Sequence, residues 1–365
     1  MSDTQPSLAA IILAAGEGSR MRSERPKPLH RLCGRPMLMY VLDSLGSTGA
    51  SRAAIVVGHK GEWVTKTMQE QGHAIAIDFV EQRVQRGTGD ATLVGLVGLG
   101  DDEDDGDVLV LPGDAPLLRQ ETLSEMVEHH RATGAAATVL TAVMDDATGY
   151  GRVIRSADGR VQRIVEHRDA SAEELEVNEI NTSIYCFRRS LLAPALRRVE
   201  PDNAQGEYYL TDVISVLVST GHPVTAVVAD DASETQGVND RLQLSRAESE
   251  LRRRTNTELL RSGVTMVDPT SVYVDTTVVV GRDVTLFPGV ILQGSTVVGD
   301  GTELGPDTRL VDTVVGADCV IEQTTARAAR IGDRAVVGPF ASLAPGSEVA
   351  DDTVTGAFYT ADATS

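Results

Sequence analysis

The sequence is poor in cysteine, and this scarcity argues against two kinds of stabilising chemistry. Its 365 residues include only three cysteines, Cys33, Cys186 and Cys319, which are far apart and odd in number. None of them stands in a CxxC spacing, so neither a disulfide framework nor a structural zinc site is expected. This cysteine usage predicts a reducing, cytoplasmic location.

Long apolar runs are also missing. Hydrophobic residues make up 41% of the chain, yet no run approaches the roughly 20 apolar residues that span a bilayer. Residues 1–7 are polar and lack the basic and then apolar pattern of a secretory signal. We therefore expect a chain with an ample core, long enough for two domains, and no membrane partner.

Positive charge is the third scarcity. The 33 Lys and Arg residues against 53 Asp and Glu residues give a net charge of −20. Such a surface repels nucleic acid and anionic lipid, so neither is an expected partner, and an anionic substrate would need a local cluster of basic side chains. The acidic run 101–105 is expected to be a solvated loop rather than a metal site, because blocks of like charge usually stay exposed.

The first part of the chain alternates short apolar runs with helical patterns. Strands are expected at 8–13, 53–57, 75–80, 108–111 and 136–143, and a helix from Pro36 to Leu45. This alternation predicts an α/β fold with a Rossmann-like, mixed and mostly parallel sheet covered by helices on both faces. Ligands of such sheets bind at the carboxyl ends of the strands, so the loops after Leu13, Val80 and Leu111 should lie together.

The last part of the chain has a six-residue repeat. A polar helix pattern over 239–261 leads into it as a connector. Aliphatic residues then recur in phase at Val280, Leu286, Leu292, Val298, Leu304 and Leu310, at Val315 and Ile321, and at Ile331, Val337, Leu343 and Val349. This period predicts a short left-handed parallel β-helix of about four coils. The expected domains are an α/β domain at 1–240, a linker helix at 241–262 and the β-helix with its tail at 263–365.

A glycine-rich turn follows the first strand, and two cations follow the turn. The run LAAGEGSRM begins at Leu13, and Arg20 and Lys27 can supply charge to phosphates that the backbone N–H groups approach. The alternatives are a tight surface turn or a dinucleotide fingerprint, although Met21 stands where the third glycine of that fingerprint belongs. The P-loop pattern does not occur.

Three further sets of residues suit a nucleotide and a sugar. Asp114, after Pro112-Gly113, could bind Mg²⁺ at a strand end, or could simply belong to a turn. Gln82 can present an amide to a base edge, and the glycine-rich stretch with Gly87 and Thr88 can let a base lie against the backbone. The simpler alternative is that these glycines only form a turn. The third set, which suits sugar hydroxyls but which no spacing rule singles out, is Gly151, Glu166 and Asn181.

Taken together, these stretches resemble the bacterial N-acetylglucosamine-1-phosphate uridylyltransferases, the N-terminal half of a bifunctional enzyme whose C-terminal half acetylates glucosamine 1-phosphate. The resemblance covers residues 8–346. It rests on LAAGEGSRM, RPKPLH, RGTGDA, PGDAPLL, TGYGRV, IVEH, EINTS, QGEYYLTD and GVNDRLQL. It implies a Mg²⁺-dependent reaction of UTP with N-acetylglucosamine 1-phosphate, which yields the UDP-sugar for cell-wall synthesis and pyrophosphate.

The resemblance also implies a role for each matching residue. Arg20 and Lys27 would hold the phosphates and act in catalysis. The nucleotide would contact Leu13, Ala14, Ala15, Gly16, Lys27, Gln82, Gly87 and Thr88. The metal would bind Asp114 and Asn239, and the amino sugar would contact Gly151, Glu166, Asn181 and Asn239.

The chain departs from the family pattern at a few positions. Asp90 stands where the family commonly has His, and Pro112 replaces the usual residue before Gly-Asp, which leaves another sugar 1-phosphate or another NTP as an alternative. In the C-terminal half, Ala344 and Asp362 replace basic residues and the histidine-bearing coils are missing, so no acetyltransferase activity is expected. A non-catalytic regulatory or scaffold subunit is the alternative of another class. A homotrimer through the β-helix is also expected.

Overall fold

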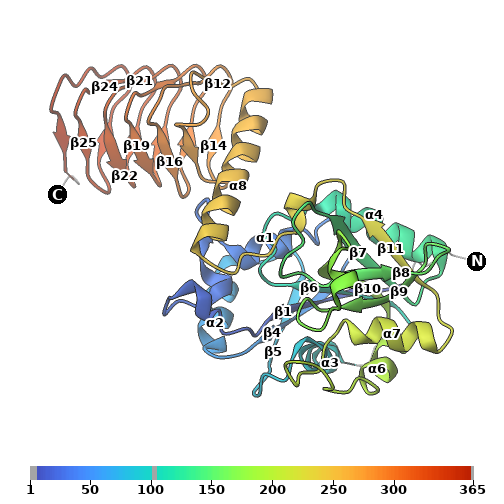
Figure 1. The fold of residues 1–365 in the computed structure, drawn as a ribbon. Helices are drawn as coiled ribbons and strands as arrows, with labels where there is room; N and C mark the ends of the chain where they lie inside the picture. Colours follow the sequence, from blue (N-terminus) through green and yellow to red (C-terminus); the bar gives the residue numbers. More distant parts are fainter. Residues whose placement is uncertain (1–5, 101–104, 363–365) are drawn as a thin grey trace, which may run out of the picture. The chain divides into compact units, whose positions relative to one another are not determined.

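A computed structural model of the chain describes residues 6–100 and 105–362 (Figure 1). Residues 101–104 of the acidic run, which was expected to be a solvated loop, lie outside the described residues. The chain divides into two compact units, Met1–His30 with Pro36–Gln243, and Arg31–Arg35 with Leu244–Ser365. The domain boundaries expected at residues 240 and 262 stay predictions. No helix in the described ranges is long and apolar enough to cross a membrane.

The first unit is built on a nine-stranded sheet. Its main path has the order β11-β7-β10-β6-β1-β4-β5, with β8 and β9 as a hairpin attached to β10. The strands are β1 (Leu8–Ala14), β4 (Arg52–Val57), β5 (Ala76–Glu81), β6 (Asp107–Pro112), β7 (Ala137–Val143), β8 (Arg152–Arg155), β9 (Val161–Val165), β10 (Glu179–Arg188) and β11 (Val224–Val228). Four of the six neighbouring pairs on this path are parallel, and β10 runs antiparallel between β6 and β7. The predicted mixed, mostly parallel sheet is confirmed.

Helices cover both faces of this sheet because its central strands are apolar on both sides. Ile11 packs in one core cluster and Ile12 in the other. The first cluster includes α3 (Thr88–Gly98), α6 (Arg189–Leu196) and α7 (Asp212–Ser219), which lie together in Figure 1. The second includes α1 (Met37–Asp43), α2 (Gly61–Gln71) and α4 (Gln120–Thr133). Short elements complete the unit: α5 (Ala172–Leu175) and the 3₁₀ helices η1 (Ser19–Met21), η2 (Lys27–Leu29) and η3 (Ala232–Thr235).

The strand register places the expected loops at one edge of the sheet. Leu13 pairs with Pro112, Ala14 with Val57, and Val57 in turn with Glu81. Parallel strands in this register end at the same level, so the turns after β1, β4, β5 and β6 gather there. The grouping that the sequence predicted for the loops after β1, β5 and β6 is therefore present.

The second unit contains α8 (Arg241–Arg261), whose first residues belong to the first unit, and a hairpin of β2 (Arg31–Leu32) and β3 (Arg35–Pro36). The hairpin was not foreseen from the sequence. The backbone N–H of Cys33 donates to Glu248 Oε2 at 2.9 Å, and the N–H of Thr276 donates to the carbonyl of Cys33 at 3.3 Å. A short segment from early in the chain is thus built into the C-terminal unit.

Beyond α8 the chain forms three parallel sheets of two- and three-residue strands. The first comprises β12 (Thr265–Met266), β15 (Thr285–Leu286), β18 (Glu303–Leu304), β21 (Val320–Ile321) and β24 (Val336–Val337). The second comprises β13 (Tyr273–Val274), β16 (Ile291–Gln293), β19 (Arg309–Val311), β22 (Thr325–Arg327), β25 (Ser342–Leu343) and β27 (Thr360–Ala361). The third comprises β14 (Val279–Val280), β17 (Val297–Val298), β20 (Val314–Val315), β23 (Arg330–Ile331) and β26 (Glu348–Val349).

These sheets are the faces of the predicted left-handed β-helix, which is confirmed. Successive in-phase aliphatics such as Leu286 and Leu304 stack in its core. The count of about four coils was too low, because the sheets have five or six strands each. The counted run of in-phase aliphatics began at Val280 and ended at Val349. It therefore left out the first coil, which contains Met266 and Val274, and the last strand, which contains Ala361.

Candidate active site

A cavity of about 490 Å³ lies where β1 and β6 end. The start of α3 and two later loops complete its wall. Of the residues singled out from the sequence, the cavity is lined by Leu13, Ala14, Ala15, Gly16, Lys27, Gln82, Gly87, Thr88, Asp114, Asn181 and Asn239. Arg20, Gly151 and Glu166 do not line it. Most of the predicted site is therefore gathered around one cavity in the first unit.

The turn after β1 depends on a glycine to bring Lys27 to the cavity. Gly18 has a φ of +65°, and a Cβ at this position would lie 2.7 Å from Lys27 Cβ. Only glycine allows both this backbone conformation and this close approach. Arg20 is exposed on η1, and its contact with phosphate stays a prediction.

Lys27 lies between the two residues predicted to bind the metal. Its Nζ donates to Asn239 Oδ1 at 2.8 Å and forms an ion pair with Asp114 Oδ2. The loop that carries Asn239 packs on Asp114, since the Val238 N–H donates to the Asp114 carbonyl at 2.8 Å. Two oxygens from residues 125 positions apart therefore converge on one cation.

This donor set fits a divalent cation. A carboxylate and an amide oxygen are hard ligands, and the ammonium group of Lys27 stands in for a metal ion between them. Within 6–100 and 105–362, no group of three or more His, Cys, Asp or Glu side chains is placed to hold a metal. A cation at Asp114 and Asn239 would therefore complete its coordination with phosphate oxygens and water, as Mg²⁺ commonly does.

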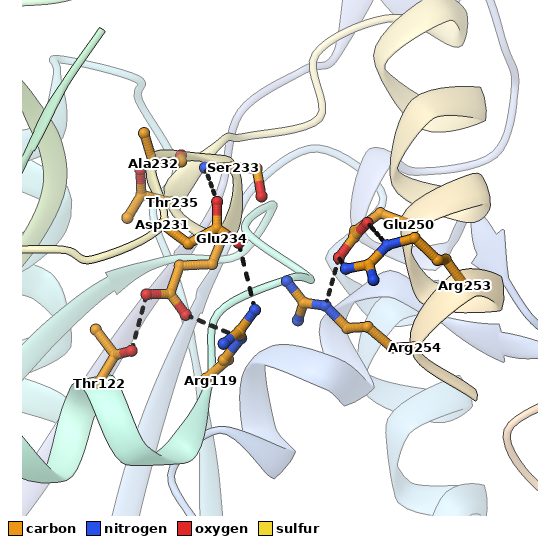
Figure 2. Close-up of polar contacts among 10 residues, drawn as sticks. All are labelled: Arg119, Thr122, Asp231, Ala232, Ser233, Glu234, Thr235, Glu250, Arg253 and Arg254. Atoms are coloured by element: carbon orange, nitrogen blue, oxygen red, sulfur yellow. Dashed lines mark hydrogen bonds and ion pairs between the residues drawn. The ribbon is translucent and has the colours of Figure 1, made fainter. Parts of the chain in front are cut away.

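The 3₁₀ helix η3 anchors the loop that leads to Asn239. Glu234, which is 2% exposed, accepts a hydrogen bond from Thr122 Oγ1 at 2.8 Å, and its Oε2 lies 3.7 Å from Arg119 Nε (Figure 2). Asp231 caps η3 by accepting from the Ser233 N–H at 2.9 Å. These contacts tie η3 to α4 and its N-cap.

Figure 2 also shows Arg253 and Arg254 bound to Glu250 on α8.

The part of the cavity expected to hold the base is formed by Gln82 and the segment before α3. Gln82 is 5% exposed, and its Nε2 donates to Asp90 Oδ2 at 2.8 Å. Gly87 has a φ of +108°, and a Cβ there would lie 2.6 Å from the carbonyl oxygen of Tyr208. The glycine at this position is therefore required by the backbone, whatever it contacts in a ligand.

The residues expected to hold the sugar are close to one another. A Cβ on Gly151 would lie 3.5 Å from both Asn181 Cβ and Glu166 Oε2, and the Asn181 N–H donates to the Gly151 carbonyl at 2.9 Å. Glu166 accepts from Thr211 Oγ1 at 3.3 Å. Burial raises the pKa of the Glu166 carboxyl, and the nearby Asp169 and Asp212 raise it further. Only Asn181 of the three faces the cavity.

Sequence reasoning missed a second, smaller cavity of about 280 Å³ that shares Ala14, Gly16 and Pro28 with the first. Its lining includes Arg25, His59 and Lys60, and Lys60 Nζ donates to the Glu24 carbonyl at 2.9 Å. The lining also includes Glu17 and Glu24, and Lys60 Nζ forms an ion pair with Glu24 Oε2 at 2.7 Å, so the charges of this hollow are mixed. His59 and Lys60 directly follow β4, so the rule that ligands bind beyond strand ends could have pointed to them.

Comparisons with known proteins define the class. Residues 9–244 match the protein family described as "Nucleotidyl transferase". A crystal structure of UDP-glucose pyrophosphorylase complexed with UDP-glucose aligns with a TM-score of 0.55 over 68% of this chain and 99% of that chain. At 15% identity this likeness shows the fold alone. With its fold, its cavity and this family match, the chain is a nucleotidyltransferase.

The relatives narrow the class to one family. "Bifunctional protein GlmU" of Exiguobacterium sibiricum is 44% identical over 334 residues, which are 92% of this chain and 73% of that protein. The protein of the same name from Streptomyces avermitilis is 46% identical over 350 residues, 96% of this chain and 72% of that protein. The chain belongs to the GlmU family. Its predicted class, UDP-N-acetylglucosamine pyrophosphorylase, is thereby confirmed, and enzymes of this kind use a divalent metal.

Proposed function

We propose that the chain converts UTP and N-acetyl-α-D-glucosamine 1-phosphate into UDP-N-acetylglucosamine and pyrophosphate, with Mg²⁺ as the metal. The observation that carries this proposal is the convergence of Asp114 and Asn239 on the ammonium group of Lys27 inside the strand-end cavity. A cation site and a lysine ammonium group in one place are what two phosphate-bearing substrates need on a protein of net charge −20.

In the proposed reaction, a phosphate oxygen of the sugar 1-phosphate attacks the α-phosphorus of UTP while the bond to pyrophosphate breaks. No protein nucleophile is required, because such transfers depend on positioning and charge neutralisation. Mg²⁺ bound at Asp114 and Asn239 would neutralise phosphate charge. Lys27 would then exchange its contacts with these two oxygens for a contact with a phosphate, and the backbone of Ala15 and Gly16 would lie against the nucleotide.

The sugar would be held by Asn181 at the cavity wall, with Gly151 and Glu166 behind it. A bulge in β10 supports this role for Asn181, since the register of β10 against β7 shifts between Asn181 and Ile184. Asn181 Oδ1 accepts from the Ser183 N–H at 3.2 Å, and its amide NH₂, which has two hydrogens, also bonds to Tyr185. An amide donor with a carboxylate beside it suits the hydroxyl and acetamido groups of the sugar.

Pyrophosphate release tests the proposal directly. The protein is incubated with Mg²⁺, each of the four NTPs, and N-acetylglucosamine, glucosamine or glucose 1-phosphate. Release with UTP and N-acetylglucosamine 1-phosphate alone would support the proposed reaction. Release only with another pair would replace the substrates, and no release with any pair would favour a non-catalytic subunit.

We further propose that these 365 residues have no acetyltransferase activity. The support is chemical, since Ala344 and the exposed Asp362 offer no cation to a sugar phosphate where the family pattern has one. Acetyl-CoA with glucosamine 1-phosphate should then yield no free thiol. Thiol release above the protein-free rate would overturn this part of the proposal.

A homotrimer through the β-helix also remains a proposal, as does the cytoplasmic location. One outer face of the β-helix supports association, because the stacked side chains of Val279, Val297 and Val314 are 59%, 38% and 42% exposed. Light scattering should give 3 × 38.8 kDa, about 116 kDa. A mass of 38.8 kDa would remove the trimer from the proposal.

A further inference from the structure

The side-chain amide of Gln82 is held in one orientation by two acceptors. Its Nε2 donates to Asp90 Oδ2 at 2.8 Å and to the carbonyl of Gly87 at 3.4 Å. A carboxylate and a carbonyl oxygen only accept hydrogen bonds, so turning the amide over would place its Oε1 against two oxygens. The side chain is also 5% exposed, which leaves it little room to move.

The fixed amide presents an acceptor to the cavity. Both Nε2 hydrogens are directed at protein, and no residue in the described ranges donates to Gln82 Oε1. Gln82 lines the cavity, so this oxygen is left for a ligand. The backbone N–H of Gly87, for which the described residues offer no acceptor, is a donor in the same wall. The wall thus offers one acceptor and one donor.

The position of Asp90 is itself fixed by the first turn of α3. The Gly89 N–H donates to the Tyr208 carbonyl at 2.7 Å, and the Leu210 N–H donates to Thr88 Oγ1 at 3.0 Å. These bonds clamp the turn that carries Asp90 to the segment at 208–210. A carboxylate in the first turn of a helix is also favoured by the helix dipole.

We propose that Asp90 is a positioning residue that determines base specificity, because it locks the Gln82 amide with Oε1 toward the cavity. Uracil has a ring N–H next to a carbonyl oxygen, which matches one acceptor and one donor. Cytosine has an unprotonated ring nitrogen next to an amino group, which is the reverse pattern. The departure from the family pattern at position 90 therefore favours uracil. This inference rests on the proposed uridylyl transfer.

The test compares UTP with CTP. For wild type, Asp90→Ala and Asp90→Asn, kcat/KM is measured for each nucleotide with N-acetylglucosamine 1-phosphate. Asp90→Ala should lower the UTP-to-CTP ratio by about tenfold, the size of one hydrogen bond to a charged group. The loss should appear mainly in the KM for UTP. Asp90→Asn keeps an oxygen that accepts from Gln82 Nε2 and should retain most of the ratio.

Val97→Ala is the matched control, because Val97 lies on the same helix and is 74% exposed. It should leave the ratio and both rates unchanged. If Asp90 had only a structural role, Asp90→Ala would lower kcat/KM for UTP and for CTP by the same factor and leave the UTP-to-CTP ratio unchanged. An Asp90→Ala ratio within twofold of wild type would overturn the proposal.

Failure of the proposed function would be recognised separately. If wild type releases no pyrophosphate from UTP and N-acetylglucosamine 1-phosphate, that function is wrong. Calorimetric binding of UTP and CTP to wild type and to Asp90→Ala then decides the inference. A preference for UTP that falls in the variant supports it. An unchanged preference, or no binding to wild type, overturns it.

Discussion

Lys27 offers a direct test of the proposed cation site, since its ammonium group contacts both Asp114 and Asn239. A metal ion that enters without nucleotide has to displace this charge. Lys27→Met should therefore raise the affinity for Mn²⁺ in the nucleotide-free protein by about tenfold and lower turnover by at least about 100-fold. Titration by electron paramagnetic resonance measures the first effect. The exposed Lys66, changed to Met, is the control, and an unchanged Mn²⁺ affinity of Lys27→Met would contradict the shared site.

Asp114 should matter far more for turnover than for stability. Its side chain is 20% exposed and that of Lys27 is 15% exposed, and Lys27 keeps its hydrogen bond to Asn239 when the ion pair is lost, so the loss of stability should be modest. Asp114→Asn keeps the shape of the side chain but removes the charge that would hold the metal. We expect turnover to fall by about 100-fold or more, with a change in unfolding free energy of about 1–2 kcal/mol. Turnover near the wild-type rate would exclude Asp114 as a metal ligand.

Glu166 gives a prediction with a defined dependence on pH. Its pKa is raised in the folded protein, because burial and the nearby Asp169 and Asp212 outweigh the hydrogen bond from Thr211, which lowers it. Such a group contributes stability at low pH that is lost as the pH rises through the folded pKa. Glu166→Gln removes this loss, so the variant should melt about 1–3 °C above wild type at pH 8, with a smaller difference at pH 5.

The same substitution should weaken sugar binding, because a neutral amide replaces a carboxylate acceptor. The KM for N-acetylglucosamine 1-phosphate should rise by about tenfold, while the KM for UTP changes little. Glu173→Gln, at an exposed position, is the control. The pH prediction has its own test. If the melting temperature of Glu166→Gln minus that of wild type is smaller at pH 8 than at pH 5, the carboxylate stabilises the fold and the prediction is wrong.

Among the elements, η3 and its contacts with α4 position Asn239. Thr122→Val keeps the volume of the side chain but removes the hydroxyl that donates to the buried Glu234. We expect a loss of about 1–2 kcal/mol in unfolding free energy and a several-fold rise in the Mg²⁺ concentration that gives half-maximal turnover. Ser124→Ala, in the same helix but paired with Ser47, should change neither. Weaker stability without any change in the Mg²⁺ requirement would show that η3 does not position Asn239.

The elements that the sequence predicted are those with a strong local pattern. The strands near Leu13 and Leu111 are continuous apolar runs, and the β-helix repeats an aliphatic residue in phase. The hairpin at Arg31–Arg35 was missed because its partners, Glu248 and Asp275, are more than 200 residues away. At Ala326 the buried position is filled by a small residue, so the repeat could not be followed there.

The candidate site was predicted to a similar extent and for a similar reason. Residues that directly follow strands, such as Gly16 and Asp114, could be grouped because parallel strands end at one edge. The link between Asp90 and Gln82 depends on how α3 packs beside β5, which no spacing rule encodes. The same holds for Lys27, whose contact with Asn239 spans 212 positions.

For the whole molecule, the division into two units predicts that folding and turnover can be perturbed separately. Every residue that lines the main cavity lies in Met1–His30 or Pro36–Gln243. Gly34 belongs to the other unit, has a φ of +84°, and a Cβ there would lie 2.5 Å from Asp275 Oδ2. Gly34→Ala should therefore destabilise the β-helix unit while turnover per folded molecule is kept.

The expected loss for Gly34→Ala is about 2–4 kcal/mol, from backbone strain together with the clash. Gly72→Ala separates the two terms, because Gly72 also has a positive φ of +69° but has no atom within 4 Å of the added Cβ. It should lose only about 1 kcal/mol. Asp275→Ala removes the side chain that the added Cβ would meet. In that background Gly34→Ala should therefore cost less unfolding free energy than in wild type, by the amount due to the clash, as measured by urea unfolding. A loss of unfolding free energy for Gly34→Ala no larger than that for Gly72→Ala would contradict this prediction, as would a fall in turnover per folded molecule. Either result would show that the hairpin does not belong to a β-helix unit that is independent of the cavity.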